Sequence, residues 1–319
     1  MGYTYCSSVL ETIGNTPLIK LEKLGQGLPG NVLVKAEFLN PTGSFKDRIA
    51  LKMIEDAEAQ GKLTPGGIVL EVTSGNTGAG LALVCALKGY RFIAVMSEGN
   101  SMERRQMIRA YGGELELVPQ CPHSIPGQVT GEDLELVEKR AAQLVEELGA
   151  FWANQFDNPS TIAAHHLTTA KEIIQQTGGK VDIFLDVVGT ASGFVGTARG
   201  LKEYNPQIRC LVIEPEVAPF LAGKPVISKN HKLQGSSYAF APGNWDASLC
   251  DGYLTVTDQE AIEMTRKLAR AEGMMTGYTS GANVAAALKL ASDCEPGTNI
   301  VTLLCDTGLK YLSTDLYRI

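Results

Sequence analysis

Several features that would place this chain in a special class of protein are absent from its 319 residues. The longest unbroken apolar run, Ala79–Leu87, is about half as long as a membrane-spanning helix requires. The N-terminus has neither a basic segment nor an apolar stretch, so it does not resemble a secretory signal. A net charge of −7 gives no electrostatic footprint for nucleic acid. We therefore expect a cytoplasmic protein that binds neither membrane nor nucleic acid.

Metal and disulfide patterns are also lacking. The seven cysteines contain no CxxC pair, and the four histidines form no HExxH motif. Without an export signal a disulfide framework is not expected, so the sequence predicts buried free thiols and no metal site.

Short β-rich runs alternate with helical patterns along the chain, which predicts an α/β protein with twisted, mainly parallel sheets in two closely packed lobes. Irregular, Pro- and Gly-containing segments are expected over Pro119–Gly131 and Pro215–Asp251. The predicted strands are Ile68–Val72, Phe92–Met96, Glu114–Val118, Val181–Val188, Ile208–Ile213 and Asn299–Leu304. The predicted helices are Gly78–Lys88, Met102–Tyr111, Glu132–Leu148, Gly193–Tyr204, Asp258–Glu272 and Ser280–Ala291, together with one that begins near Lys46 and runs to Glu58. The apolar face of the helix Glu132–Leu148 would comprise Leu134, Val137, Ala141, Leu144, Val145 and Leu148.

Four segments carry residue types suited to chemistry. NPTGSFKDR (Asn40–Arg48) places Lys46 at a helix start, where its amine would be nucleophilic if desolvated, although a solvated lysine paired with an acid is the simpler reading. TSGNTG (Thr73–Gly78) and GTASGFVG (Gly189–Gly196) each follow a strand and open a helix, so their backbone N–H groups could cradle anions or merely form tight turns. GYTSGA (Gly277–Ala282) places Ser280 where it could serve a ligand or only cap a helix.

A dinucleotide site is an alternative interpretation of the second segment. GNTGAG (Gly75–Gly80) opens a helix, and Glu98 follows the next strand. The glycines have the order G-x-x-G-x-G instead of G-x-G-x-x-G, and this interpretation would leave Lys46 without a role.

Together these segments resemble the cysteine synthase family of pyridoxal-phosphate (PLP) enzymes, a fold type II group that includes cystathionine β-synthase, threonine dehydratase and tryptophan synthase β. The resemblance covers nearly the whole chain. It rests on IGNTPLIKL (Ile13–Leu21), NPTGSFKDR, TSGNTG, NQFDNP (Asn154–Pro159), HKLQG (His231–Gly235), FAPGNWD (Phe240–Asp246), GYTSGANVAAALKLA and CDTGLKYLSTDLY.

The resemblance implies a role for each matching residue. Lys46 would hold PLP as an internal aldimine, Asn76 would contact the cofactor's 3′-oxygen, and Ser280 would face its pyridine nitrogen. The cofactor phosphate would lie in a loop comprising Gly189, Thr190, Ala191, Ser192 and Gly193. The substrate would be bound by Thr73, Ser74, Gly75, Asn76, Thr77 and Gln155, with Gly235 and Tyr238 in a neighbouring loop. Residues 45–155 would form a smaller mobile lobe, and 1–44 with 156–319 a larger lobe.

The reaction implied is β-replacement on an activated serine through an α-aminoacrylate, by default O-acetylserine plus sulfide giving cysteine and acetate, in a homodimer. A serine at the ring nitrogen would favour prompt β-elimination over carbanion chemistry. A serine or threonine dehydratase, a cysteine-degrading lyase, or replacement with another activated serine or nucleophile remains open.

Several positions depart from the family pattern. The lysine motif is TGSFK instead of SGSVK, and the phosphate loop is GTASG instead of GTGGT, so that Gly193 replaces a threonine. The later loop is QGSSYAF instead of QGIGAGF, and Cys305 replaces a proline. Tyr238 would bring a hydroxyl towards the substrate, with cofactor occupancy unaffected because its loop is distant in sequence from every cofactor-binding segment.

Overall fold

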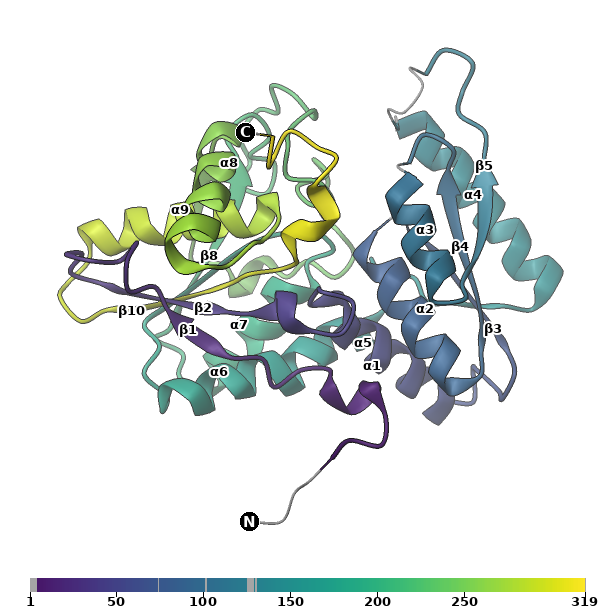
Figure 1. Cartoon of the computed structure of the whole chain (residues 1–319), viewed down its shortest axis with the longest axis horizontal. Helices are drawn as coiled ribbons and strands as arrows, with labels where there is room; N and C mark the ends of the chain where they lie inside the picture. Colours follow the sequence, from purple (N-terminus) through teal and green to yellow (C-terminus); the bar gives the residue numbers. More distant parts are fainter. Residues whose placement is uncertain (1–4, 74, 101, 125–128, 130, 319) are drawn as a thin grey trace. The chain divides into compact units, whose positions relative to one another are not determined.

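The computed structural model describes residues 5–73, 75–100, 102–124, 129 and 131–318 (Figure 1). The chain divides into two compact units, one of Met1–Ile13 with Lys46–Ser160 and the other of Gly14–Phe45 with Thr161–Ile319. The predicted larger lobe includes all of 1–44, whereas the first unit of the structure includes the segment up to Ile13. Mobility of the smaller unit stays a prediction.

The smaller unit contains a four-stranded parallel sheet in the order β5-β4-β3-β6. The strands are β3 (Ile68–Val72), β4 (Arg91–Ser97), β5 (Glu114–Val118) and β6 (Phe151–Trp152), and the helices are α1 (Lys46–Ala59), α2 (Asn76–Lys88), α3 (Met102–Ala110) and α4 (Gly131–Leu148). The α4 side chains Val137, Ala141 and Leu144 pack on one sheet face with Leu70. The apolar face predicted for this helix is wrong at its ends, because Leu134 and Leu148 are 44% and 36% exposed.

The larger unit contains a six-stranded sheet in the order β1-β2-β10-β7-β8-β9, in which the β1–β2 pair is antiparallel and the other pairs are parallel. Its strands are β1 (Leu18–Lys20), β2 (Asn31–Lys35), β7 (Ile183–Val187), β8 (Arg209–Pro215), β9 (Gly252–Val256) and β10 (Asn299–Leu303). Its helices are α5 (Pro159–Ala164, beginning in the smaller unit), α6 (Ala170–Thr177), α7 (Ser192–Tyr204), α8 (Asp258–Lys267) and α9 (Tyr278–Asp293). Leu185 packs into a core with residues of α8 and α9, and Phe184 into another with residues of α7. Both faces of β7 are therefore covered, which explains its apolar sequence.

The predicted strands and helices are confirmed, with shifts at some ends. Asp258–Glu272 is α8 followed by a π-helical turn over Leu268–Glu272. The seven cysteines are all free, but only Cys85, Cys210 and Cys305 are buried, and Cys6 is exposed. No helix among the described residues is both long and apolar enough to cross a membrane.

Candidate functional site

Lys46, the predicted cofactor lysine, is the first residue of α1 and half-buried. The start of this helix packs closely against α2. A Cβ at Gly80 of α2 would lie 3.2 Å from the Lys46 carbonyl oxygen and 3.1 Å from Ala50 Cβ. Lys46 therefore lies at the helix start that its motif predicts.

The loop between β3 and α2 is organised by Thr73. Its Oγ1 accepts hydrogen bonds from the N–H groups of Gly78 at 3.1 Å and Gly75 at 3.4 Å. Asn76 then opens α2, whose first N–H groups are directed out of the helix end, as an anion site requires. Ser74, another predicted substrate residue, lies outside the described residues.

Two of the predicted substrate residues contact each other directly. The Thr77 hydroxyl donates a hydrogen bond of 2.7 Å to Gln155 Oε1, and both side chains are buried. The Gln155 N–H approaches Glu71 Oε1 at 3.4 Å. Glu71 is not among the predicted site residues; its carboxyl is 1% exposed, and burial raises its pKa to about 8. A carboxylate in the middle of the apolar run IVLEV was the available signal.

The predicted phosphate loop in the larger unit joins β7 to α7. Ala191 is in the left-handed region with φ 66°, a conformation that costs a residue with a Cβ about 1–2 kcal/mol. The Val195 N–H bonds to the Ala191 carbonyl, so the turn delivers the chain directly into the helix. The buried hydroxyls of Thr190 and Ser192 lie 3.1 Å apart. This helix start offers two hydroxyls as well as backbone N–H groups to an anion.

Ser280 lies in the first turn of α9 and is fully buried, and its Oγ has no hydrogen-bond partner in the described part of the chain. The same holds for the Oγ1 of Thr276, which the sequence analysis did not single out. Buried polar atoms are nearly always paired, so these orphaned hydroxyls indicate a group that the protein binds here.

Asn283, one turn after Ser280, attaches α9 to the central strands. Its Nδ2 donates to Asp186 Oδ1 at 2.7 Å and to the Leu303 carbonyl, and its Oδ1 accepts from Val187 N–H. Asp186 Oδ2 in turn would lie 3.2 Å from a Cβ at Gly193. The helix that carries Ser280 and the phosphate loop are thereby held in one framework.

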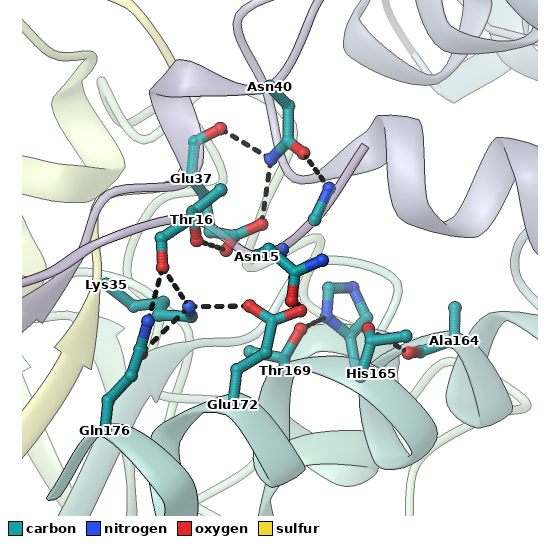
Figure 2. Close-up of polar contacts among 12 residues, drawn as sticks. Asn15, Thr16, Lys35, Glu37, Asn40, Ala164, His165, Thr169, Glu172 and Gln176 are labelled. Atoms are coloured by element: carbon teal, nitrogen blue, oxygen red, sulfur yellow. Dashed lines mark hydrogen bonds and ion pairs between the residues drawn. The ribbon is translucent and has the colours of Figure 1, made fainter. Parts of the chain in front are cut away.

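The segment that leads to Lys46 is anchored in the larger unit by the polar network in Figure 2. Glu37 accepts from the Thr16 hydroxyl at 2.6 Å and from Asn40 Nδ2 at 3.0 Å, and Asn40 Oδ1 accepts from Gly14 N–H. Beside it the buried Lys35 forms a 2.6 Å ion pair with Glu172 (Figure 2). The IGNTP motif thus holds the start of the NPTGSF loop.

The loop carrying Gly235 and Tyr238 lies directly against the phosphate loop. The Ser237 N–H bonds to the Val188 carbonyl at 2.8 Å, and a Cβ at Gly189 would be 2.7 Å from the Gly235 carbonyl oxygen. The loop is therefore close in space to a cofactor-binding segment although it is distant in sequence. The reason given above for an unaffected cofactor occupancy is wrong. Tyr238 stacks on Phe240, with ring centroids 5.6 Å apart.

One group of possible metal ligands lies on the smaller unit. Ligand atoms of Cys121, His123 and Glu132 all fall within 4.8 Å of one another. The side chains of His123 and Glu132 are mostly exposed, and His123 Nε2 lies 2.5 Å from Glu132 Oε2, a contact that accounts for two of the three groups. The expectation of no metal stays a prediction.

Comparison with known proteins identifies the family. Residues 9–306 match the family model described as "Pyridoxal-phosphate dependent enzyme". A cysteine synthase of Staphylococcus aureus (strain Mu50 / ATCC 700699) is 42% identical over 311 residues, which cover 97% of this chain and 96% of the relative.

Two solved structures show the same likeness. A crystal structure of O-ureido-L-serine synthase is 40% identical in sequence to this chain, with a TM-score of 0.88. The match covers 98% of this chain and 96% of the synthase chain. O-acetyl serine sulfhydrylase isoform 3 from Entamoeba histolytica is 35% identical with a TM-score of 0.91, covering 99% and 92%.

The chain therefore belongs to the pyridoxal-phosphate dependent enzymes, with the fold type II architecture predicted from its sequence. The family match replaces the dinucleotide interpretation of Gly75–Gly80. The residues present fit the cofactor: the orphaned Ser280 hydroxyl suits a ring nitrogen, and the start of α7 suits a phosphate.

Proposed function

We propose that the protein catalyses PLP-dependent β-replacement on an activated serine, with O-acetylserine and sulfide giving cysteine and acetate as the default reaction. The observation that carries this is the fully buried Ser280 Oγ without a partner. A hydroxyl at the pyridine nitrogen does not hold the ring protonated, which favours loss of a leaving group at Cβ. The similarity to cysteine synthase and to O-acetyl serine sulfhydrylase supports the choice of substrate.

Each of the chain's own site residues would have a separate role. PLP supplies the electron sink that makes the α-proton of the bound amino acid acidic. Lys46 would hold the cofactor, and its freed amine would remove the α-proton and later return it to Cα. The loop Thr73–Thr77 and Gln155 would bind the substrate carboxylate, Asn76 the cofactor's 3′-oxygen, and the start of α7 the phosphate.

A second candidate is replacement with a nucleophile other than sulfide. The 40% identical O-ureido-L-serine synthase, named for a different product, supports it. So does the loop Gly235–Phe240, where Tyr238 introduces a hydroxyl and an aromatic stack. A homodimer in the cytoplasm, with a mobile smaller lobe, completes the proposal by analogy with the family.

A spectral titration tests the reaction. The holoenzyme is mixed with acetylserine, phosphoserine, serine or cysteine while the absorbance of the bound cofactor is followed, and each candidate nucleophile is then added and the product identified by mass. We expect acetylserine to change the spectrum and sulfide to restore it with release of cysteine. Release of pyruvate without capture of any nucleophile would instead indicate a dehydratase or lyase.

Reduction with borohydride tests the assignment of Lys46. Peptide mapping should place the pyridoxyl group on Lys46, and its recovery on any other lysine would contradict the mechanism.

A further inference from the structure

Glu71 occupies an unusual place for an acidic residue. It lies in β3, an internal strand with β4 on one side and β6 on the other. Glu71 is 1% exposed, and its partner in β4 is Ala94. Leu70 beside it faces the core formed with α4. Because side chains alternate along a strand, Glu71 faces the opposite side of the sheet. Acidic side chains are almost never fully buried unless they are paired.

The carboxyl group of Glu71 is connected to the predicted substrate-binding residues. Its Oε1 accepts from the Gln155 N–H, and hydrogen bonds from the Asn154 N–H and the Gln155 side chain also reach it. Asn154 is held in the left-handed region with φ 45°, so Glu71 fixes a strained turn. Gln155 Oε1 in turn accepts a hydrogen bond from the Thr77 hydroxyl at the start of α2. Glu71 Oε2 has no hydrogen-bond partner among the described residues.

The charges around Glu71 decide its protonation. Burial raises its pKa to about 8, although the hydrogen bonds and the positive charge of Lys46 act in the opposite direction. Lys46 at the start of α1 is the ionisable group that acts on it. Asp47, the next residue of α1, is buried and points to Gly80 on α2. Ala94 of β4, Thr77 of α2 and the Asn154–Gln155 turn carry no charge. Glu71 is therefore mostly protonated at neutral pH.

We propose that Glu71 is a positioning residue that holds Gln155 and the Asn154 turn as a neutral acid with its proton on Oε2, and that its ionisation weakens binding of the substrate carboxylate. The proposal rests on the proposed function, because Gln155 and the Thr73–Thr77 loop are taken as the carboxylate site. A second negative charge behind that site would repel the bound carboxylate, whereas a neutral acid supports Gln155 without that repulsion.

The test compares the holoenzyme with its Glu71→Gln, Glu71→Asp and Glu98→Gln variants. Binding of L-serine is measured from pH 6.5 to 9.5 through the absorbance of the bound cofactor. Glutamine keeps the shape of the neutral acid and cannot ionise, so its Kd should match that of the wild type below about pH 7. At about pH 9, one unit above the pKa of Glu71, the wild type should bind about tenfold more weakly than Glu71→Gln. Titration of the L-serine amine is common to all four proteins and cancels in the ratio.

Two matched variants separate charge from position. Glu71→Asp keeps the acid but withdraws it by one methylene, so it should bind L-serine more weakly at every pH, and Glu71→Gln should not. Glu98→Gln changes an exposed acid at the end of β4 and should follow the wild type throughout. Parallel pH curves for wild type and Glu71→Gln would overturn the proposal, as would loss of binding at all pH values in Glu71→Gln.

A readout without substrate keeps this result distinct from the proposed function. The infrared spectrum of the holoenzyme at pH 6.5 should contain a protonated-carboxyl band that Glu71→Gln lacks. Absence of that difference would contradict the neutral acid even if L-serine binds normally. Conversely, a wild type that shows the band but binds no amino acid would contradict the proposed function and leave the protonation of Glu71 established.

Discussion

Restoring the family's threonine at position 193 is expected to fail unless Phe45 is changed as well. A Cβ at Gly193 would lie 2.9 Å from Phe45 Cε2 and 3.2 Å from Asp186 Oδ2. The first distance is shorter than real Cβ contacts allow, so Gly193→Thr must displace the Phe45 ring. Phe45 is one of two positions at which TGSFK departs from SGSVK, and Gly193 is one of three at which GTASG departs from GTGGT. The departures are neighbours in the larger unit, and we expect them to be coupled.

The sizes of the opposing effects can be compared. Inserting a side chain into a packed site costs about 1–3 kcal/mol. A hydroxyl donating to a phosphate contributes about 1.5–3 kcal/mol, but only if the side chain can enter the site. Phe45 is half-buried, and trimming it to valine loses part of the roughly 3–5 kcal/mol of a full Phe→Ala truncation. Residues in contact typically couple by about 0.5–3 kcal/mol.

The assay is a double-mutant cycle of Phe45→Val, Gly193→Thr and the double variant, with urea unfolding and the Kd for PLP measured for each. Gly193→Thr alone should lose about 1–3 kcal/mol of stability and bind PLP more weakly. The double variant should be more stable than the sum of the singles by about 1–3 kcal/mol, and it should bind PLP more tightly than Gly193→Thr. Gly193→Ala is the control, because it adds the Cβ that meets the Phe45 ring without adding the threonine hydroxyl. Additivity within about 0.5 kcal/mol would refute the reasoning.

Three further outcomes follow from single side chains. Ser280→Ala removes an orphaned buried hydroxyl, so the cofactor-free chain should keep or gain up to about 1 kcal/mol of stability, while PLP affinity falls up to about tenfold. Ser280→Asp should hold the ring nitrogen protonated and slow turnover far more, and equal collapse of both variants with loss of the fold would indicate a structural cap. Tyr238→Phe keeps the stack on Phe240 and should change the ranking of at least three activated serines by up to about tenfold in kcat/KM. An unchanged ranking would remove Tyr238 as a source of selectivity. The pKa of Glu71 is raised from 4.5 to about 8 on folding, so its contribution to stability is complete below pH 4.5 and is lost as pH rises through 8. Each unit of difference between these two pKa values corresponds to about 1.4 kcal/mol, so the stability lost when Glu71 ionises is at most about 5 kcal/mol. Urea unfolding of Glu71→Gln should lack this slope, and equal slopes in both proteins would contradict the buried neutral acid.

Strands with clear patterns could be predicted, whereas β1, β2, β6 and β9 could not. β3 and β5 were predicted at their observed bounds because each is a β-rich run with turn residues on both sides. β6 has two residues, too few for any periodicity. β9 follows the long irregular segment, and its alternating exposure is typical of an edge strand that the sheet itself stabilises.

The candidate site could be assembled from the sequence only through the family resemblance. Spacing alone left Ser280 as a possible helix cap, and burial of its unpaired hydroxyl is a property of the folded chain. Asn283 lies inside the GYTSGAN motif, but its three hydrogen bonds reach residues about 20 and 97 positions away. No local pattern predicts such partners. Glu71 was missed because a single acid in an apolar strand is easily taken for an exposed residue.

The departures from the family pattern have a physical explanation that bears on substrate choice. Phe45 meets position 193, its N–H bonds to the Cys305 carbonyl, and Cys305 Sγ lies 3.8 Å from Asp186 Oδ1. Gly193 and Cys305 therefore adjoin one buried carboxylate, and Phe45 adjoins both of them, so a change at one alters the space available to the others. Such a group can exchange together while the phosphate site is kept, so these three residues do not by themselves indicate a new substrate. Another departure spans Ser236–Ala239 in the loop beside Gly189, where Ser236 is buried and the other three residues are half-exposed. If selectivity differs from that of O-acetyl serine sulfhydrylases, grafting QGIGAGF into this loop should change it, and the Phe45→Val/Gly193→Thr exchange should not.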